Sequence, residues 1–97
     1  MIDLPQNHFE QLCEIVKRHL HGAEVFAFGS RVAGRAKMLS DLDLILKPAA
    51  MLPWRTLPEL RGAFEASDLP ITVDVVDWNS CAERLQSRVA PQLVQVS

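Results

Sequence analysis

The chain has little of what marks a secreted, membrane or nucleic-acid-binding protein. Its 97 residues include two cysteines, Cys13 and Cys81, without a Cys-x-x-Cys motif or the spacing of a disulfide framework. Both are therefore expected to be free, buried thiols in a reducing compartment. No stretch approaches the roughly 20 apolar residues of a membrane helix, and the amino terminus lacks the regions of a signal peptide. We therefore expect a cytoplasmic protein that does not contact a membrane.

An excess of positive charge is also missing. Ten Lys and Arg against twelve Asp and Glu leave a formal net charge of −2 and a pI near 5.8. A general nucleic-acid binder needs a basic face to neutralise phosphates, so the composition argues against that class. The length allows one domain, residues 1–97, that buries roughly 60% or more of its unfolded surface. We expect no second, substrate-binding domain.

A short apolar strand that ends in a glycine–serine pair is the most informative feature present. Residues 25–28 read Val-Phe-Ala-Phe, a run typical of a strand, and Gly29-Ser30 follows as a pair suited to a tight strand-to-helix turn. The first N–H groups of a helix lack intrahelical partners, and the helix dipole favours negative charge there. This turn therefore predicts a binding site for the phosphates of a nucleoside triphosphate.

Basic side chains follow the turn. Arg31 comes directly after Ser30 and is the best candidate for a phosphate contact. Arg35 and Lys37 lie further along the same segment. For these two, contact with the triphosphate and a solvated face of a short helix are equally good explanations.

Two aspartates at the start of the next strand are candidate metal ligands. Ser40 leads into the alternating run Asp41-Leu42-Asp43-Leu44. In a strand both aspartates project from one face while the leucines enter the core. Their Cα atoms would then lie roughly 6.5–7 Å apart. Carboxylates at that spacing can converge on a pair of divalent ions, which hold the attacking and leaving oxygens in phosphoryl transfer.

Asp74 is the candidate for a third carboxylate. It lies within residues 71–76, a run rich in β-branched side chains, where an aspartate is costly unless it has a charged partner. Two carboxylates about 4 Å apart repel by roughly 4 kcal/mol at an effective dielectric of about 20. A cluster of three aspartates therefore predicts a bound cation.

Together, the Gly-Ser-x9-Ser-Asp-x-Asp pattern and the later strand aspartate resemble the DNA polymerase β nucleotidyltransferase superfamily. Residues 25–45 resemble its minimal nucleotidyltransferase (MNT) branch, and the likeness extends to residues 67–70 and 73–78. Both motifs at this spacing are far more specific than either motif alone. One position departs from a common form of the family, because Ala33 stands where an arginine often precedes the second glycine, Gly34.

The resemblance implies a reaction and a role for each motif residue. The reaction is transfer of a nucleoside monophosphate, AMP from ATP, to a hydroxyl with release of pyrophosphate. It implies two Mg²⁺ ions, which Mn²⁺ can replace, with Asp74 as the acceptor of the hydroxyl proton. The nucleotide-binding residues are then Gly29, Ser30, Arg31 and Ser40, and the catalytic metal ligands are Asp41, Asp43 and Asp74.

The resemblance also implies a partner. MNT proteins of this kind pair with an all-helical HEPN protein as the antitoxin of a toxin–antitoxin system, and some adenylylate that protein on a tyrosine. This chain contains no tyrosine, so it cannot be its own tyrosyl acceptor, which fits modification in trans. A hetero-oligomer with the HEPN protein is therefore expected, and a homodimer stays open.

Two other function classes remain at this point. One is a non-catalytic, nucleotide-binding antitoxin subunit that acts by binding alone, against which the intact aspartates argue. The other is a transferase that modifies a small molecule such as an aminoglycoside, although relatives with that chemistry are usually longer.

The pattern of elements predicts a single α/β (α+β) domain, a polymerase β-like core with a small mixed β-sheet flanked by helices. An apolar stripe from Phe9 to Leu20 predicts the first helix, with Gly22 as its C-terminal cap. Strands are expected at 25–28, 41–46 and 71–76, with a short helix after Ser30 and an edge strand at 93–96. Capping boxes at 56–59 and 80–83 predict the starts of two further helices, the last ending near Arg88.

Other conspicuous residues are expected to be structural or to form an interface. Asp77 is expected to cap a turn, and Asp68 lies in a sequence typical of a turn. Trp54 and Trp78 could stack on a nucleotide base, but core or interface positions are favoured about three to one. We expect Met51, Leu52 and Trp54 to form an exposed apolar patch that binds a partner.

Overall fold

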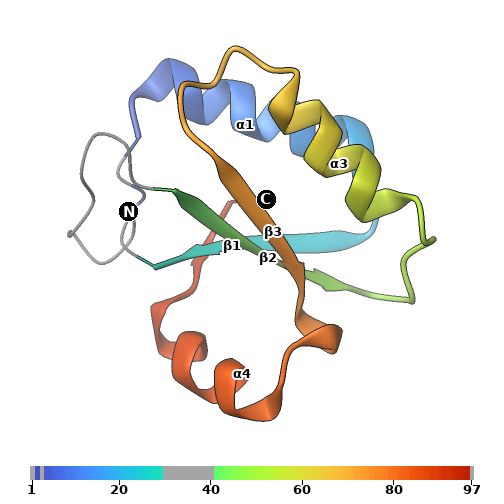
Figure 1. Cartoon of the computed structure of the whole chain (residues 1–97). Coiled ribbons are helices and arrows are strands. Elements are labelled where there is room, and N and C mark those ends of the chain that lie inside the picture. The colour runs from blue at the N-terminus through green and yellow to red at the C-terminus, as the bar shows by residue number, and fades with distance from the viewer. Residues whose placement is uncertain (1, 3, 30–40, 97) are drawn as a thin grey trace.

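A computed structural model of the chain describes residues 2, 4–29 and 41–96. Three helices and four strands make up the described part, with short 3-10 turns at Trp78–Ser80 and Ala90–Gln92 (Figure 1). In chain order these elements are α1 (Gln6–His19), β1 (Ala23–Phe28), β2 (Leu42–Pro48), α3 (Thr56–Glu65), β3 (Val73–Asp77), α4 (Glu83–Val89) and β4 (Val94–Gln95). The expected short helix after Ser30 lies outside the described residues.

The four strands form one mixed sheet in the order β3-β2-β1-β4. β1 pairs antiparallel with both β2 and β4, whereas β2 and β3 run parallel. The prediction of an α/β (α+β) fold with a small mixed sheet flanked by helices is therefore confirmed. The expected edge strand near the carboxyl end is also confirmed, as β4.

One face of the sheet carries the main hydrophobic core. Alternate residues of β2 point to this face, and Leu42, Leu44 and Leu46 are fully buried there. α1 and α3 cover it together (Figure 1), and α1 contributes the stripe expected from its sequence. The buried residues of that stripe are Leu12, Ile15, Val16 and Leu20.

The other face of the sheet carries the β2 residues that alternate with these leucines. Ile45 points to this side and is fully buried, and Figure 1 places α4 over it. Asp43 and Lys47 lie on the same face of β2, two residues to either side of Ile45. Among the described residues of this face, Asp43 at the start of β2 is half-buried, whereas Ile45 is fully buried.

The ends of α1 and α3 differ from the sequence prediction. α1 ends at His19 with the extended residue Leu20 as its C-cap, so Gly22 is not the cap. The positive φ of Gly22, 74°, instead turns the chain into β1. Thr56 is the first residue of α3 rather than its N-cap, because the turn before it already has helical geometry at Arg55.

The second predicted capping box also does not form. Ser80 belongs to the 3-10 turn after β3, so Ala82 is the N-cap of α4 and its side chain makes no capping hydrogen bond.

Both thiols are free as predicted, but Cys13 and Cys81 are half-buried rather than buried. Among the described helices, none is long and apolar enough to cross a membrane.

Candidate active site

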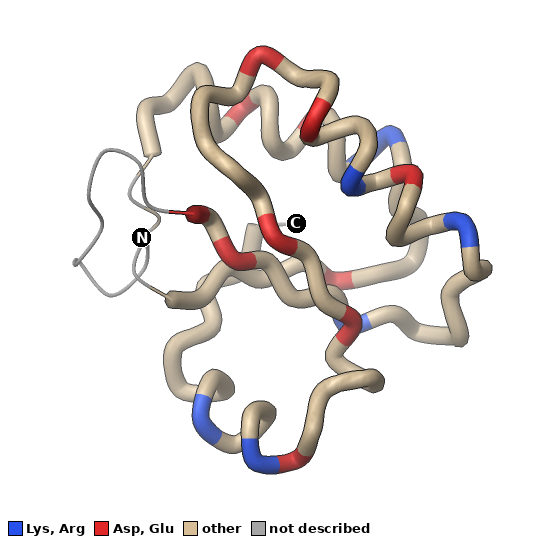
Figure 2. The backbone as a smooth tube through the Cα atoms, in the orientation of Figure 1, with Lys and Arg blue, Asp and Glu red and all other residues tan. Residues whose placement is uncertain are grey.

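Two of the predicted carboxylates lie in a row with Phe28, the residue just before the turn glycine, across three strands. Phe28 at the end of β1 pairs with Asp43 on β2, and Asp43 pairs with Asp74 on β3. Adjacent strands are about 4.8 Å apart, so this register brings residues distant in sequence into one row. Figure 2 shows the acidic residues of β2 and β3 next to each other at this end of the sheet.

Gly29 directly follows Phe28 along the chain and lies against the Asp43 carboxylate. Its φ is +85°, in the left-handed region that glycine adopts without strain, as predicted for a tight turn. A Cβ built on Gly29 would lie 2.6 Å from Asp43 Oδ2, so any side chain at this position would require the carboxylate to move. The backbone of the turn therefore lies directly against this carboxylate, and Ser30, Arg31 and Ser40 lie outside the described residues.

The pKa of the Asp43 carboxyl is raised by its surroundings. Burial raises its pKa above the ordinary value, and the negative charges of Asp74 and then Asp41 raise it further. Asp43 is half-buried, whereas the other two are exposed. Burial and the neighbouring negative charges therefore both disfavour the charged form of Asp43.

No described basic side chain neutralises these charges. Within residues 2, 4–29 and 41–96, the single ion pair joins Arg18 to Glu14 on the exposed side of α1. A cation that bound between the carboxylates would relieve both the desolvation of Asp43 and its repulsion by its neighbours. The electrostatics thus favour a positively charged ligand at this end of the sheet.

The donor set fits Mg²⁺ delivered with a nucleotide better than a cage made by the protein alone. No group of three His, Cys, Asp or Glu side chains in the described part of the chain is gathered tightly enough to hold a metal ion. Mg²⁺ prefers hard oxygen ligands, and in phosphoryl-transfer sites one or two carboxylates hold it together with substrate phosphates and water. Asp43 and its acidic neighbours match that requirement.

Asp77 and Asp68 have the structural positions expected of them. Asp77 accepts a 2.9 Å hydrogen bond from the backbone N–H of Asn79 and so caps the 3-10 turn after β3. Asp68 is exposed in the connection between α3 and β3, where the Ser67 hydroxyl donates to the Phe64 carbonyl. Neither belongs to the row of Asp43 and Asp74.

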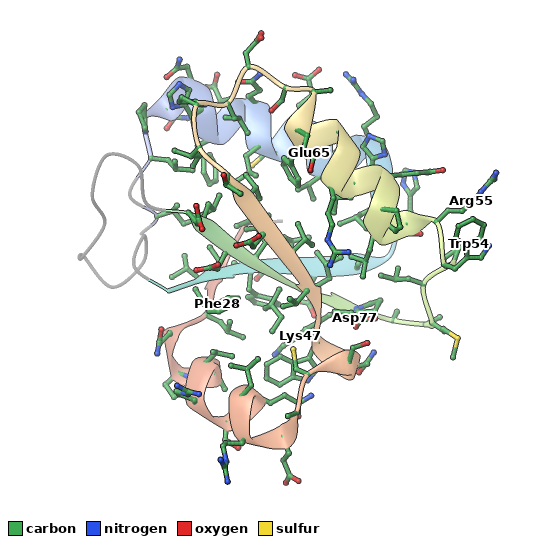
Figure 3. All side chains as sticks on the ribbon, in the orientation of Figure 1. Phe28, Lys47, Trp54, Arg55, Glu65 and Asp77 are labelled. Atoms are coloured by element: carbon green, nitrogen blue, oxygen red, sulfur yellow. The ribbon has the colours of Figure 1, made fainter. Side chains whose placement is uncertain are left out.

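Trp78 packs against a lysine. Lys47 Nζ lies 4.2 Å from the centre of the Trp78 ring and 5.0 Å from that of Phe26, which makes a cation–π sandwich on the Asp43 face of the sheet. The half-buried Trp78 is therefore a packing residue. Trp54, by contrast, is 82% exposed at the far end of β2 (Figure 3), so it is not part of the core.

Sequence reasoning overlooked two basic side chains that make contacts on the sheet outside the motifs. Lys47 lies four residues after Asp43, but no motif includes it, and its aromatic partners come from distant segments. Arg61 on α3 donates a 2.8 Å hydrogen bond to the backbone carbonyl of Val75 on β3. An arginine in an amphipathic helix gives no sequence signal for such a contact.

The fold and the row of residues at the sheet end define a nucleotidyltransferase of the polymerase β type. Residues 10–95 match the Polymerase beta nucleotidyltransferase family, and the chain belongs to this family. The resemblance drawn from the Gly-Ser and Asp-x-Asp motifs is thereby confirmed.

Similarity to particular proteins indicates which nucleotidyltransferases this chain resembles. The chain is 37% identical over 82 residues to the probable protein adenylyltransferase MntA of Haemophilus influenzae, covering 84% of this chain and 72% of MntA. One chain in a crystal structure of a toxin–antitoxin with AMP-PNP superposes with a TM-score of 0.75 at 27% identity, covering 97% of this chain and 73% of that one.

A second solved structure agrees in fold. It holds a tri-AMPylated HEPN toxin of Shewanella oneidensis in complex with an MNT antitoxin, and one of its chains superposes with a TM-score of 0.71. The identity is 24%, with 95% of this chain and 71% of that chain covered.

Proposed function

We propose that this chain is a single-domain protein adenylyltransferase that transfers AMP from ATP to a hydroxyl of a HEPN-type partner, as the antitoxin of a toxin–antitoxin pair. The observation that carries the proposal is the contact of the Gly29 turn with Asp43 together with the pairing of Asp43 with Asp74. It combines an anion-binding turn with neighbouring carboxylates whose charges no described basic residue offsets. Similarity to MntA adds the protein acceptor and the adenylyl group.

Each residue of the proposed site has a distinct task. The turn at Gly29 and Ser30 binds the triphosphate through backbone N–H groups, and Arg31 and Ser40 are further proposed nucleotide-binding residues. Asp41, Asp43 and Asp74 would hold two Mg²⁺ ions, which supply charge neutralisation on the phosphates and lower the pKa of the acceptor hydroxyl. Asp74, the exposed carboxylate of the row, receives the proton of that hydroxyl.

The proposed partner follows from the relatives and from the surface of the chain. The superposed toxin–antitoxin structure holds AMP-PNP, and the 24%-identical structure agrees in fold alone. Met51 and Trp54 are 94% and 82% exposed, which agrees with two of the three residues expected to form the apolar patch. The third, Leu52, is half-buried and packs against the hydrophobic core, so the patch consists of Met51 and Trp54. We propose that this patch binds the HEPN-type protein and holds the pair together as a hetero-oligomer.

Intact-mass measurement tests the proposal. The chain co-expressed with a HEPN-type protein should co-purify with it and, given ATP and Mg²⁺, add one AMP mass or a small multiple to that protein. Asp43→Asn should abolish the mass shift, and Asp77→Asn, a matched change outside the row, should retain it. A partner that is bound and silenced without any adduct would replace this account with an antitoxin that acts by binding alone.

Dependence on divalent ions gives a second test. ATP should bind weakly in the presence of a chelator and more tightly with Mg²⁺ or Mn²⁺, because the clustered carboxylates otherwise repel the triphosphate. Equal affinity in both conditions, measured by calorimetry, would contradict the proposed metal dependence.

A further inference from the structure

A cavity of about 480 Å³ opens between α3 and β3 and reaches Asp74. Arg61, Phe64 and Glu65 of α3 form one wall, and residues 69–74 form the other. Figure 3 shows Glu65 at the end of α3, beside β3. The volume falls in the range of about 300–1,000 Å³ typical of ligand-binding clefts.

The chemistry of transfer places the acceptor on the side of this cavity. The attacking and leaving oxygens lie roughly in line through the α-phosphorus, so they occupy opposite sides of it. The phosphate-binding turn lies at the β1 end of the row and Asp74 at the β3 end, with Asp43 between them. If the leaving pyrophosphate lies over β1, the acceptor hydroxyl must approach from beyond β3.

Beyond β3 the sheet has an open backbone edge. β3 is the last strand in the order β3-β2-β1-β4, so one row of its main-chain groups points away from β2 among the described strands. Val75 belongs to this outward row, because its carbonyl accepts the Arg61 hydrogen bond. Alternation places the main-chain groups of Val73 on the same side, next to the cavity and one residue from Asp74.

We propose that this cavity and the edge of β3 beside Val73 form the acceptor cleft, and that its occupant is an extended polypeptide segment of the partner carrying the acceptor hydroxyl. The inference rests on the proposed function. Main-chain pairing with an open strand edge recognises polypeptides rather than small molecules. The hydroxyl oxygen bonds to the α-phosphorus, the bond from that phosphorus to the β-phosphate oxygen breaks, pyrophosphate leaves, and the proton passes to the Asp74 carboxylate.

Charge on the cleft suggests which segments it selects. Glu65 contributes a negative charge to the lining outside the proposed metal site, and Arg61 is the one positive side chain of the lining. The Arg61 guanidinium is already engaged with the Val75 carbonyl. A segment with a basic residue near its hydroxyl therefore complements the cleft.

Two variants test the cleft without altering the row. Glu65→Arg reverses the charge at its wall, and Thr72→Trp places a large side chain at an exposed lining position. Each should raise the KM for the HEPN-type partner roughly tenfold or more, while the Kd for ATP with Mg²⁺ stays within about twofold. Glu59→Arg, the same change at an exposed position of α3 outside the lining, should alter neither value.

Amide hydrogen exchange tests the strand pairing directly. Binding of the partner should slow exchange of the Val73 and Val75 amides, which lie on the outward row. If the unmutated chain modifies the partner but either the KM values or the exchange rates stay unchanged, the acceptor does not bind here. If the unmutated chain fails to modify the partner at all, the proposed adenylyl transfer is what has failed.

Discussion

Replacing Gly29 by alanine separates the backbone role of the turn from its contact with Asp43. The added Cβ would lie 2.6 Å from Asp43 Oδ2, but a carboxylate at the end of a side chain can rotate away. The main stability cost is then the positive φ of 85°, which costs a residue other than glycine roughly 1–2 kcal/mol. For a domain of this size that corresponds to a decrease in Tm of roughly 4–16 °C.

Gly22→Ala is a matched control. Gly22 has a similar φ of 74°, and a Cβ built there meets nothing within 4 Å. The two variants should therefore lose similar stability in urea or thermal unfolding, but only Gly29→Ala should lose adenylyl transfer, because only there is the central carboxylate displaced.

A double variant tests the contact between the Gly29 turn and the Asp43 carboxylate. Combining Gly29→Ala with Asp43→Ala should destabilise the protein no more than Gly29→Ala alone, since the displaced carboxylate is gone. Full adenylyl transfer by Gly29→Ala, measured by intact mass at a stability equal to that of Gly22→Ala, would refute the contact between turn and carboxylate.

Three further predictions concern charge and docking. Asp74→Asn should lower adenylyl transfer by orders of magnitude, whereas Asp77→Asn should cost about 1 kcal/mol or less of stability and little activity; the reverse ranking would contradict the β3 assignment. Because the pKa of Asp43 is raised in the folded protein, the folded state binds more protons than the unfolded chain between the ordinary and raised values. The free energy of unfolding should therefore rise as pH falls through that window, and Asp43→Asn, compared by urea unfolding, should remove this rise. Changing Met51 and Trp54 to serine should weaken binding of the HEPN-type partner in gel filtration while ATP affinity is retained.

Local patterns were enough to predict the elements that build the site. Alternation of Leu42 and Leu44 with Asp41 and Asp43 predicted a strand with a leucine face and a carboxylate face, and burial of the leucines agrees. The glycine turn is likewise predicted from a few neighbouring residues, because a tight turn favours glycine, which adopts a left-handed backbone conformation without strain. Such features depend on neighbouring residues, whose spacing the sequence displays directly.

Contacts between segments that are distant in the sequence could not be predicted from local patterns. The pairing of Asp43 with Asp74 depends on the parallel register of β2 and β3, which is set by packing under α1 and α3. Both capping boxes failed for a related reason, since tertiary turns before α3 and α4 had already shifted the first helical residue. Arg61 belongs to the same group, because its acceptor is a backbone carbonyl on another strand.

The proposed docking patch and the proposed acceptor cleft lie at different ends of the sheet. β2 has 7 residues, so roughly 20 Å of strand separates the Asp43 end from the loop that holds Met51 and Trp54. A partner bound at the patch must therefore extend its acceptor segment over that distance, or present it to the cleft of another copy of this chain. In either arrangement, docking raises the local concentration of the acceptor without supplying contacts to the reacting atoms. Loss of the patch should then slow transfer at low partner concentration and have little effect at saturation, whereas loss of Asp74 should abolish it at both.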